Sequence, residues 1–303
     1  MSNIELSAAL LSNARNEALL SGRSRAQGID LRTSRLGAGG APPGAQVTEI
    51  PLAHHLAAVG AGDDSFVGVP IFTTRGFPHT QLVVRPAAGI SAPGDLAGKR
   101  VGVADLGGSE ALWARGALAH EFGVAGSSVD WVGEHGSGPQ AAGELLSRDS
   151  SVAEALVGGE LDAALLAGGA LAEGDSAKRL FADPRAEARR YHEKTGFFPA
   201  LSVVVVAREV VRRFPWVVLN LYSAFLDSKL QTVADGAGLL APYLDAGVID
   251  GATGKALATD IYTYGVTQQK DLLETAAAYA HEQGLCSSAL GLEQVFYPPT
   301  LEL

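Results

Sequence analysis

The chain has 303 residues, enough for one large or two medium-sized domains with an ample core. Hydrophobic residues make up 47% of it, which excludes a disordered or fibrous protein. The net charge is −10 and no basic cluster accompanies it, so we expect no nucleic-acid partner. Cys286 is the single cysteine, so the chain can form no intrachain disulfide.

The first twenty residues lack both a basic leader and an unbroken apolar core. They are therefore not typical of a secretory signal. No apolar run reaches the roughly 18 residues that cross a bilayer. We expect a cytoplasmic protein without membrane contact.

Strands and helices are predicted in alternation along the chain. The predicted strands cover 4–10, 28–31, 66–72, 81–85, 101–104, 129–132, 161–166 and 200–206. Predicted helices cover 13–21, 53–60, 112–122, 151–157 and 268–283, and a long helix opens at Phe214-Pro215-Trp216. The stretch 37–44, GAGGAPPG, is too rich in Gly and Pro for a regular element, so the crossover there is predicted to be irregular.

Two strings resemble the second lobe of a type II periplasmic-binding-protein fold. They are ISAPGDLAGKRVGV at 90–103 and SVAEALVGGELDAALL at 151–166. The resemblance implies an α/β protein with two lobes, a central cleft and two crossing hinge strands. We place lobe 1 at 1–86 plus 197–303 and an inserted lobe 2 at 87–196, with the crossing strands at 81–85 and 200–206.

Five further strings, in this order, resemble the 4,5-dihydroxyphthalate decarboxylase family from about Leu6 to Pro298. They are 69–72 with Arg75, Phe77 and His79; 111–116 with 120–124; 195–199; 264–266; and 279–285. The resemblance implies a decarboxylase or other carbon–carbon lyase acting on a small hydroxylated aromatic or enol-like carboxylic acid between the lobes.

The chain departs from this family where a substrate is expected to lie. Ala53, His54 and His55 replace small hydroxyl residues, Pro78 replaces a basic residue, and Ser202 stands near the place of a histidine. These departures keep open a biosynthetic dehydratase, cyclase or isomerase on the same scaffold, to which chorismate dehydratase belongs. A solute-binding protein of an ABC importer is a further alternative.

Arg75 and His79 are the predicted catalytic residues. They lie four apart just beyond a strand end, where ligands bind in open α/β sheets. An arginine fork suits a carboxylate, and histidine is readily tuned for proton transfer near neutral pH. Gly107, Gly108 and Ser109 precede a helix, where backbone N–H groups favour an anion. Further substrate-binding candidates are Asn13, Arg15, Glu49, His54, Thr74, Trp113, Arg115, His135, Phe198, Ser202 and Tyr264.

The sequence contains no G-x-S-x-G elbow, P-loop or complete G-x-G-x-x-G motif, and no carboxylate cluster indicates a metal cage. We therefore expect no cofactor and no metal, and a small carboxylate as the substrate. The sequence leaves the oligomeric state open: in a homo-oligomer, a second subunit could cover the crossover at 37–44.

Overall fold

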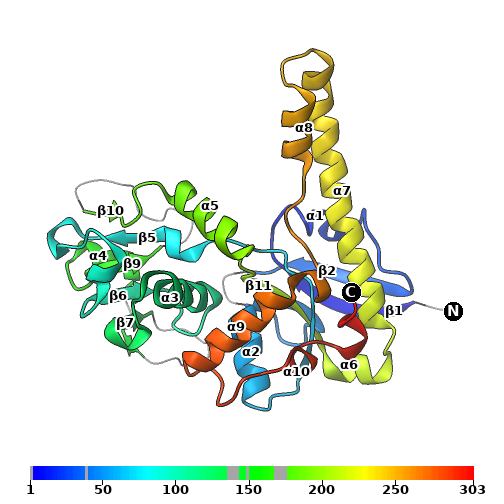
Figure 1. Cartoon of the computed structure of the whole chain (residues 1–303). Helices are drawn as coiled ribbons and strands as arrows, with labels where there is room; N and C mark the ends of the chain where they lie inside the picture. The colour runs from blue at the N-terminus through cyan, green and yellow to red at the C-terminus, as the bar shows by residue number, and fades with distance from the viewer. Residues whose placement is uncertain (1–2, 38–39, 135–142, 148–149, 167–175) are drawn as a thin grey trace.

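The computed structural model describes residues 3–37, 40–134, 143–147, 150–166 and 176–303. Two α/β lobes lie side by side, each built on one mixed sheet (Figure 1). This arrangement confirms the predicted two-lobed α/β architecture.

The first sheet has the strand order β2-β1-β3-β11-β4. Strands β1, β2 and β3 are parallel, and β11 runs antiparallel to both β3 and β4. Their bounds are β1 Ile4–Leu10, β2 Ile29–Arg35, β3 Val47–Pro51, β4 Phe66–Val69 and β11 Ser202–Ala207.

Strand β11 shows why this sheet is buried on both faces. Its valines alternate between two hydrophobic clusters, because successive side chains of a strand point to opposite faces. Val203 and Val205 pack in the cluster that contains helices α2 and α9, whereas Val204 and Val206 join the cluster that contains α6 and α7. The unbroken apolar run of this strand thus reflects helices on both sides of the sheet.

The second sheet has the order β10-β5-β9-β6-β7-β8. One face packs under α3 and the other under α4. Its strands are β5 Leu82–Val84, β6 Arg100–Val103, β7 Asp130–Gly133, β8 Glu144–Leu145, β9 Ala163–Leu165 and β10 Lys178–Arg179.

Two extended segments, 70–77 and 196–201, carry the chain between the lobes. They pair in an antiparallel bridge between Arg75 and Ala200. The Leu201 N–H donates to the Thr74 carbonyl at 2.9 Å, and the Gly76 N–H donates to the Pro199 carbonyl at 3.1 Å. The crossing lies a few residues before the predicted strands in both cases, because β5 belongs to the second sheet and β11 to the first.

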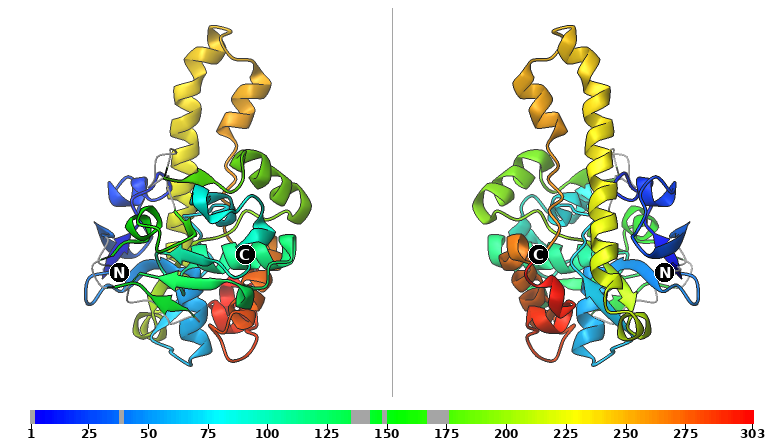
Figure 2. Two further views of the ribbon diagram at one scale, coloured as in Figure 1. Left: turned by 90° about the vertical axis from the view of Figure 1, so that its left-hand side faces the viewer. Right: turned by 90° about the vertical axis from the view of Figure 1, so that its right-hand side faces the viewer.

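The helices surround the two sheets (Figure 2). Helix α7 is much longer than its buried part: all its buried residues lie between Val217 and Ser228, and the rest projects from the body together with α8. The bounds are α1 Glu17–Leu20, α2 Leu52–Gly60, α3 Ser109–Phe122, α4 Val152–Val157, α5 Pro184–Thr195, α6 Arg208–Arg213, α7 Val217–Asp245, α8 Gly251–Ala258, α9 Lys270–Glu282 and α10 Leu292–Val295.

Near the site the predicted elements differ from the structure in two places, and helices α5, α6, α8 and α10 were not predicted. The helix expected over 13–21 is reduced to the four residues of α1, preceded by turns, and β3 was not predicted. The irregular crossover is confirmed, because the described residues between β2 and β3 contain no helix. In the described part of the chain no helix combines the length and the apolarity that crossing a membrane requires.

Candidate active site between the lobes

Glu49 on β3 is the centre of a buried polar network at the carboxyl ends of the first sheet. Its carboxylate accepts hydrogen bonds from the Leu11 N–H at 2.9 Å, from the Asn16 amide at 2.5 Å and from the Thr73 hydroxyl. Glu49 is 2% exposed, and burial raises its pKa above the usual 4.5 although these donors act in the opposite direction. The carboxyl group therefore keeps its proton to a higher pH than an exposed glutamate.

Neighbouring side chains extend this network to the edge of the sheet. The Asn13 amide donates to the Thr73 hydroxyl at 3.1 Å and accepts the Arg15 N–H at 3.0 Å. The Thr74 N–H donates to the Ser202 hydroxyl at 3.2 Å. The structure thus brings together the predicted residues Asn13, Arg15, Glu49, Thr74 and Ser202, from four different strand ends.

Arg15 is the cation of this edge that keeps an unpaired charge. Its guanidinium carbon lies 3.4 Å from the centre of the Tyr262 ring, a cation–π contact. Lys229 is paired with Asp260 at 3.0 Å, whereas no described carboxylate lies within ion-pair distance of Arg15. Tyr264 lies nearby, 6% exposed; its hydroxyl has no described hydrogen-bond partner and burial raises its pKa.

The first turns of α2 and α3 meet across the lobes. His54 Nε2 on α2 lies 2.6 Å from a carboxylate oxygen of Asp105, which follows β6 in the second lobe. The Ser109 hydroxyl at the start of α3 accepts the Ala53 N–H at 3.0 Å. We call these two contacts the latch; they join the lobes through the first turns of two helices.

Two carboxyl groups, Asp105 in the latch and Glu110 beside it on α3, have different environments. Burial opposes ionisation of Asp105, but hydrogen bonds from His54 and from the glycine N–H groups that follow it lower its pKa overall. Burial raises the pKa of Glu110, and the charge of Asp105 adds to the rise. An acid and a base side by side, with pKa values moved in opposite directions, are typical of sites that transfer protons.

The glycine loop before α3 does not present its N–H groups outward as predicted for an anion site. The Gly107 N–H donates to the Asp105 side chain at 3.0 Å, and the Gly108 N–H donates to the Asp105 carbonyl at 3.1 Å. In this conformation the Asp105 carboxylate occupies the place predicted for a substrate anion.

Arg75 acts as a hinge tie and not as a free carboxylate fork. Its Nη1 donates to the Phe198 carbonyl and its Nη2 to the Thr263 carbonyl, each at 2.6 Å. Burial lowers its pKa to about 10, so the group is still charged at neutral pH. Its backbone pairs with Ala200 in the antiparallel bridge, and its Nε has no described hydrogen-bond partner, so the catalytic role of Arg75 stays a prediction.

His79 is placed apart from the network and the latch. Its side chain is 1% exposed, its Nε2 lies 3.2 Å from Glu187 on α5, and its ring packs against Phe181 and Tyr191. Burial lowers its pKa. The ring belongs to the short helix Pro78–Gln81, and the catalytic role of His79 stays a prediction.

The remaining candidates are divided between packing and the hinge. Trp113, 1% exposed, donates its ring N–H to the Ala200 carbonyl at 2.9 Å. Phe198 stacks on Phe77 with 5.1 Å between ring centres. Arg115 lies buried on α3, and His135 falls outside the described residues.

Asp105, Glu110, Thr73 and Tyr262 belong to the site but were not predicted. Asp105 directly follows the predicted strand 101–104, so the rule that selected Asn13 could have selected it as well. No group of three or more His, Cys, Asp or Glu side chains suited to a metal occurs in the described parts of the chain.

Comparison with known proteins supports both the fold and a family resemblance. No protein-family model matches the chain. The chain is 26% identical to the 4,5-dihydroxyphthalate decarboxylase of Comamonas testosteroni over 274 residues, 84% of this chain and 83% of that protein. A shorter match has 34% identity over 86 residues. It covers 28% of this chain and 33% of the 4,5-dihydroxyphthalate decarboxylase of Pseudomonas putida.

Solved structures with the same architecture include binding proteins and an enzyme. The sulphonate-binding protein SsuA of Escherichia coli aligns with a TM-score of 0.61 at 16% identity, over 99% of this chain and 94% of its own. SsuA of Xanthomonas axonopodis aligns with a TM-score of 0.60 at 13% identity, over 98% of this chain and 99% of its own. The desulfurization enzyme DSZB aligns with a TM-score of 0.56 at 18% identity, over 99% of this chain and 98% of its own. The chain thus has the two-lobed fold of periplasmic binding proteins and resembles 4,5-dihydroxyphthalate decarboxylases along most of its length.

Proposed function

We propose that this protein is a decarboxylase acting on a small hydroxylated aromatic or enol-like carboxylic acid held between its lobes. The observation that carries the proposal is the similarity to a 4,5-dihydroxyphthalate decarboxylase over 84% of the chain. The two clusters described above supply the groups that such a reaction needs: a cation for the acid and a proton donor for carbon.

Arg15 is the group we assign to substrate binding. It is half-buried at the carboxyl end of β1, it has no described carboxylate partner, and Tyr262 holds the plane of its guanidinium. A guanidinium in this state matches a carboxylate through two parallel hydrogen bonds. Asn13 lies next to it and fixes the backbone through the Arg15 N–H.

His54 is the group we assign to proton donation. Loss of CO₂ leaves an electron pair on the carbon that carried it, so that carbon must gain a proton. A hydroxyl para to the carboxylate makes protonation of the ring carbon accessible; the carbon–carbon bond then breaks, CO₂ leaves, and its bonding pair restores the ring. Asp105, 2.6 Å from Nε2, orients the imidazole. We thus assign to His54 the proton-transfer role that the sequence predicted for His79.

The test is CO₂ release from hydroxylated phthalates by the wild type and by His54→Gln. A positioned acid contributes roughly 10²–10⁴ in rate, so kcat of the variant is expected to fall by about that factor. His120→Gln is the matched control: this exposed histidine also pairs with a carboxylate, Glu282 at 2.8 Å, away from the latch.

Three outcomes would oppose parts of the proposal. Tight binding of the acids without CO₂ release would favour a solute-binding protein. Turnover to a dehydrated or rearranged product would favour the lyases and isomerases named above. An unchanged rate in His54→Gln, with CO₂ still released, would remove only the role of His54.

A further inference from the structure

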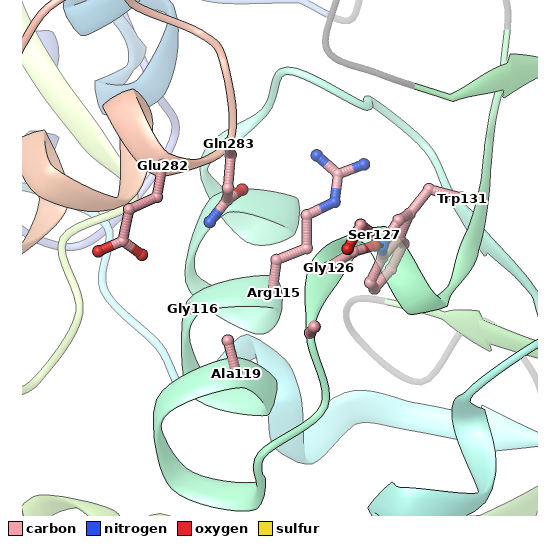
Figure 3. Close-up of a pocket in the computed structure, with 9 residues that line it drawn as sticks. Arg115, Gly116, Ala119, Gly126, Ser127, Trp131, Glu282 and Gln283 are labelled. Atoms are coloured by element: carbon pink, nitrogen blue, oxygen red, sulfur yellow. Dashed lines mark hydrogen bonds between the residues drawn. The ribbon is translucent and has the colours of Figure 1, made fainter.

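A cavity lies between the lobes, lined by a set of residues that shares no member with the network around Glu49 or with the latch. Its volume is about 400 Å³, enough for a small organic acid. Helix α3, the turn before β7 and β7 itself form one wall, and the end of α9 forms the other (Figure 3). The residues that make it hollow are small: Gly116, Ala119, Ala125 and Gly126.

Arg115 provides this cavity with a buried positive charge. It is 5% exposed, and burial lowers its pKa to about 10, which leaves it charged at neutral pH. Its Nη1 donates to the Leu106 carbonyl at 2.9 Å, and the guanidinium carbon lies 4.6 Å from the centre of the Trp131 ring. One hydrogen bond and one aromatic face therefore fix the plane of the guanidinium.

The other edge of this guanidinium is unused. Nε and Nη2 of Arg115 are buried and have no hydrogen-bond partner among the described residues. These two nitrogens form the side of the guanidinium whose parallel N–H bonds match the two oxygens of a carboxylate. Leaving such donors buried and unpaired costs free energy, which a bound anion would recover.

Gln283, facing Arg115 from α9, contributes an unpaired acceptor. Its Nε2 donates to the Leu112 carbonyl at 2.9 Å, which directs Oε1 away from that bond, and Oε1 has no partner within the described chain. The guanidinium of Arg115 lies between Gln283 and Trp131 (Figure 3). The carboxylate of the lining, Glu282, is already paired with His120 at 2.8 Å.

We propose that this cavity is a second binding site for a small carboxylic acid that also carries a hydroxyl or N–H donor. The carboxylate binds the Nε–Nη2 edge of Arg115, and the donor binds Oε1 of Gln283. Both nitrogens are buried in this conformation, so binding of the carboxylate requires α9 to shift relative to α3. Because the two residues belong to different lobes, the bound acid connects the lobes. The inference does not depend on the proposed decarboxylase function.

Equilibrium dialysis with 4-hydroxybenzoate tests this site, with the neutral 4-hydroxybenzamide as the comparison ligand. Charge-assisted hydrogen bonds contribute about 1.5–3 kcal/mol, so Arg115→Gln should weaken one class of binding roughly 10- to 100-fold. Ala119→Leu fills the cavity from a partly exposed helix position and should abolish the same class with Arg115 intact. The matched control Arg15→Gln removes a cation from the other site and should leave this class unchanged.

The variants separate the possible results. If Arg115→Gln does not fold, the binding measured with Ala119→Leu tests the proposal. Wild-type binding in Ala119→Leu would overturn the proposal, as would equal affinity for the acid and the amide. Loss of all binding in Arg15→Gln would assign the measured acid to the first site and also overturn it.

Discussion

Glu49 combines two properties that proteins rarely combine in a strand: it is almost fully buried, and it accepts hydrogen bonds from three segments. These donors come from the ends of β1 and β4 and from the turn before α1. A single carboxyl group thus fixes the relative positions of Asn13 and Thr73, which lie at the proposed substrate edge. Its protonation state is therefore expected to affect the stability of the whole sheet edge.

The pH dependence of stability follows from the raised pKa of Glu49. A carboxyl whose pKa is higher in the folded state binds more protons folded than unfolded. Its contribution to the stability of the fold is fully present below the pKa of the unfolded state, near 4.5. This contribution is lost as the pH rises through the pKa of the folded state. We expect Glu49→Gln, which removes this titration, to flatten the fall of the urea midpoint between pH 5 and pH 8. Equal slopes in wild type and variant would contradict the buried, proton-retaining carboxyl.

The site residues show what a sequence can reveal at this scale. Asn13, Arg15 and Glu49 were predictable because they lie in or after strands or match a family position. Arg75 and His79 also follow a strand end, but their partners, the Phe198 carbonyl and Glu187, lie more than a hundred residues away. Sequence spacing cannot show that such partners already occupy a side chain.

At the scale of elements, the contact between α3 and α9 depends on one glycine. A Cβ atom at Gly116 would lie 2.1 Å from the Tyr279 ring, far inside contact distance. Tyr279 in turn stacks on His120 with 4.9 Å between ring centres, so the ring cannot easily move. The close approach of the two helices, one from each lobe, therefore requires a residue without a side chain.

Gly116→Ala is accordingly expected to lower stability by about 1–3 kcal/mol, the usual cost of overpacking a filled interface. Gly238→Ala on the projecting part of α7 is the matched control, since its Cβ would meet no atom within 4 Å. There the same substitution should stabilise by about 0.5–1 kcal/mol, because alanine loses less entropy in a helix. Urea unfolding of both variants measures the difference, and equal effects would refute the close packing.

Helix α7 should behave as two halves with different local stability. Residues 217–228 carry all its buried side chains, whereas Leu239 and Tyr243 at the far end are 74% and 55% exposed. Local opening is easier where few apolar contacts are lost. We expect backbone amides beyond residue 230 to exchange with deuterium much faster than those of the first half. Uniform protection along α7 would show that another surface covers the projecting end.

Patterns of hydrophobicity predicted most elements but failed where burial and polarity coincide. Strand β11 was clear, since four consecutive valines face two cores. Strand β3 was missed because Thr48 and Glu49, both buried, interrupt its apolar pattern; their hydroxyl and carboxyl groups find partners on β1 and in the segment that follows β4. The helix expected over 13–21 was shortened because Asn13 accepts the N–H groups of Arg15 and Asn16 in a turn.

At the scale of the whole molecule, the lobes are joined by the crossing segments, the latch, and the packing of α3 against α9. The latch involves His54 and Asp105, the groups we assign to proton transfer. On the proposed function, the contact that joins the lobes is therefore also the contact that orients the proton donor.

The most direct measurement is incubation of the protein with 4,5-dihydroxyphthalate in D₂O, followed by quantification of CO₂ and of deuterium in the product. We expect equal amounts of CO₂ and monocarboxylate, with one deuterium on the carbon that lost its carboxyl group, and a large fall of this yield in His54→Gln but not in His120→Gln. Binding of the acid without release of CO₂, under conditions in which the protein is folded, would contradict it.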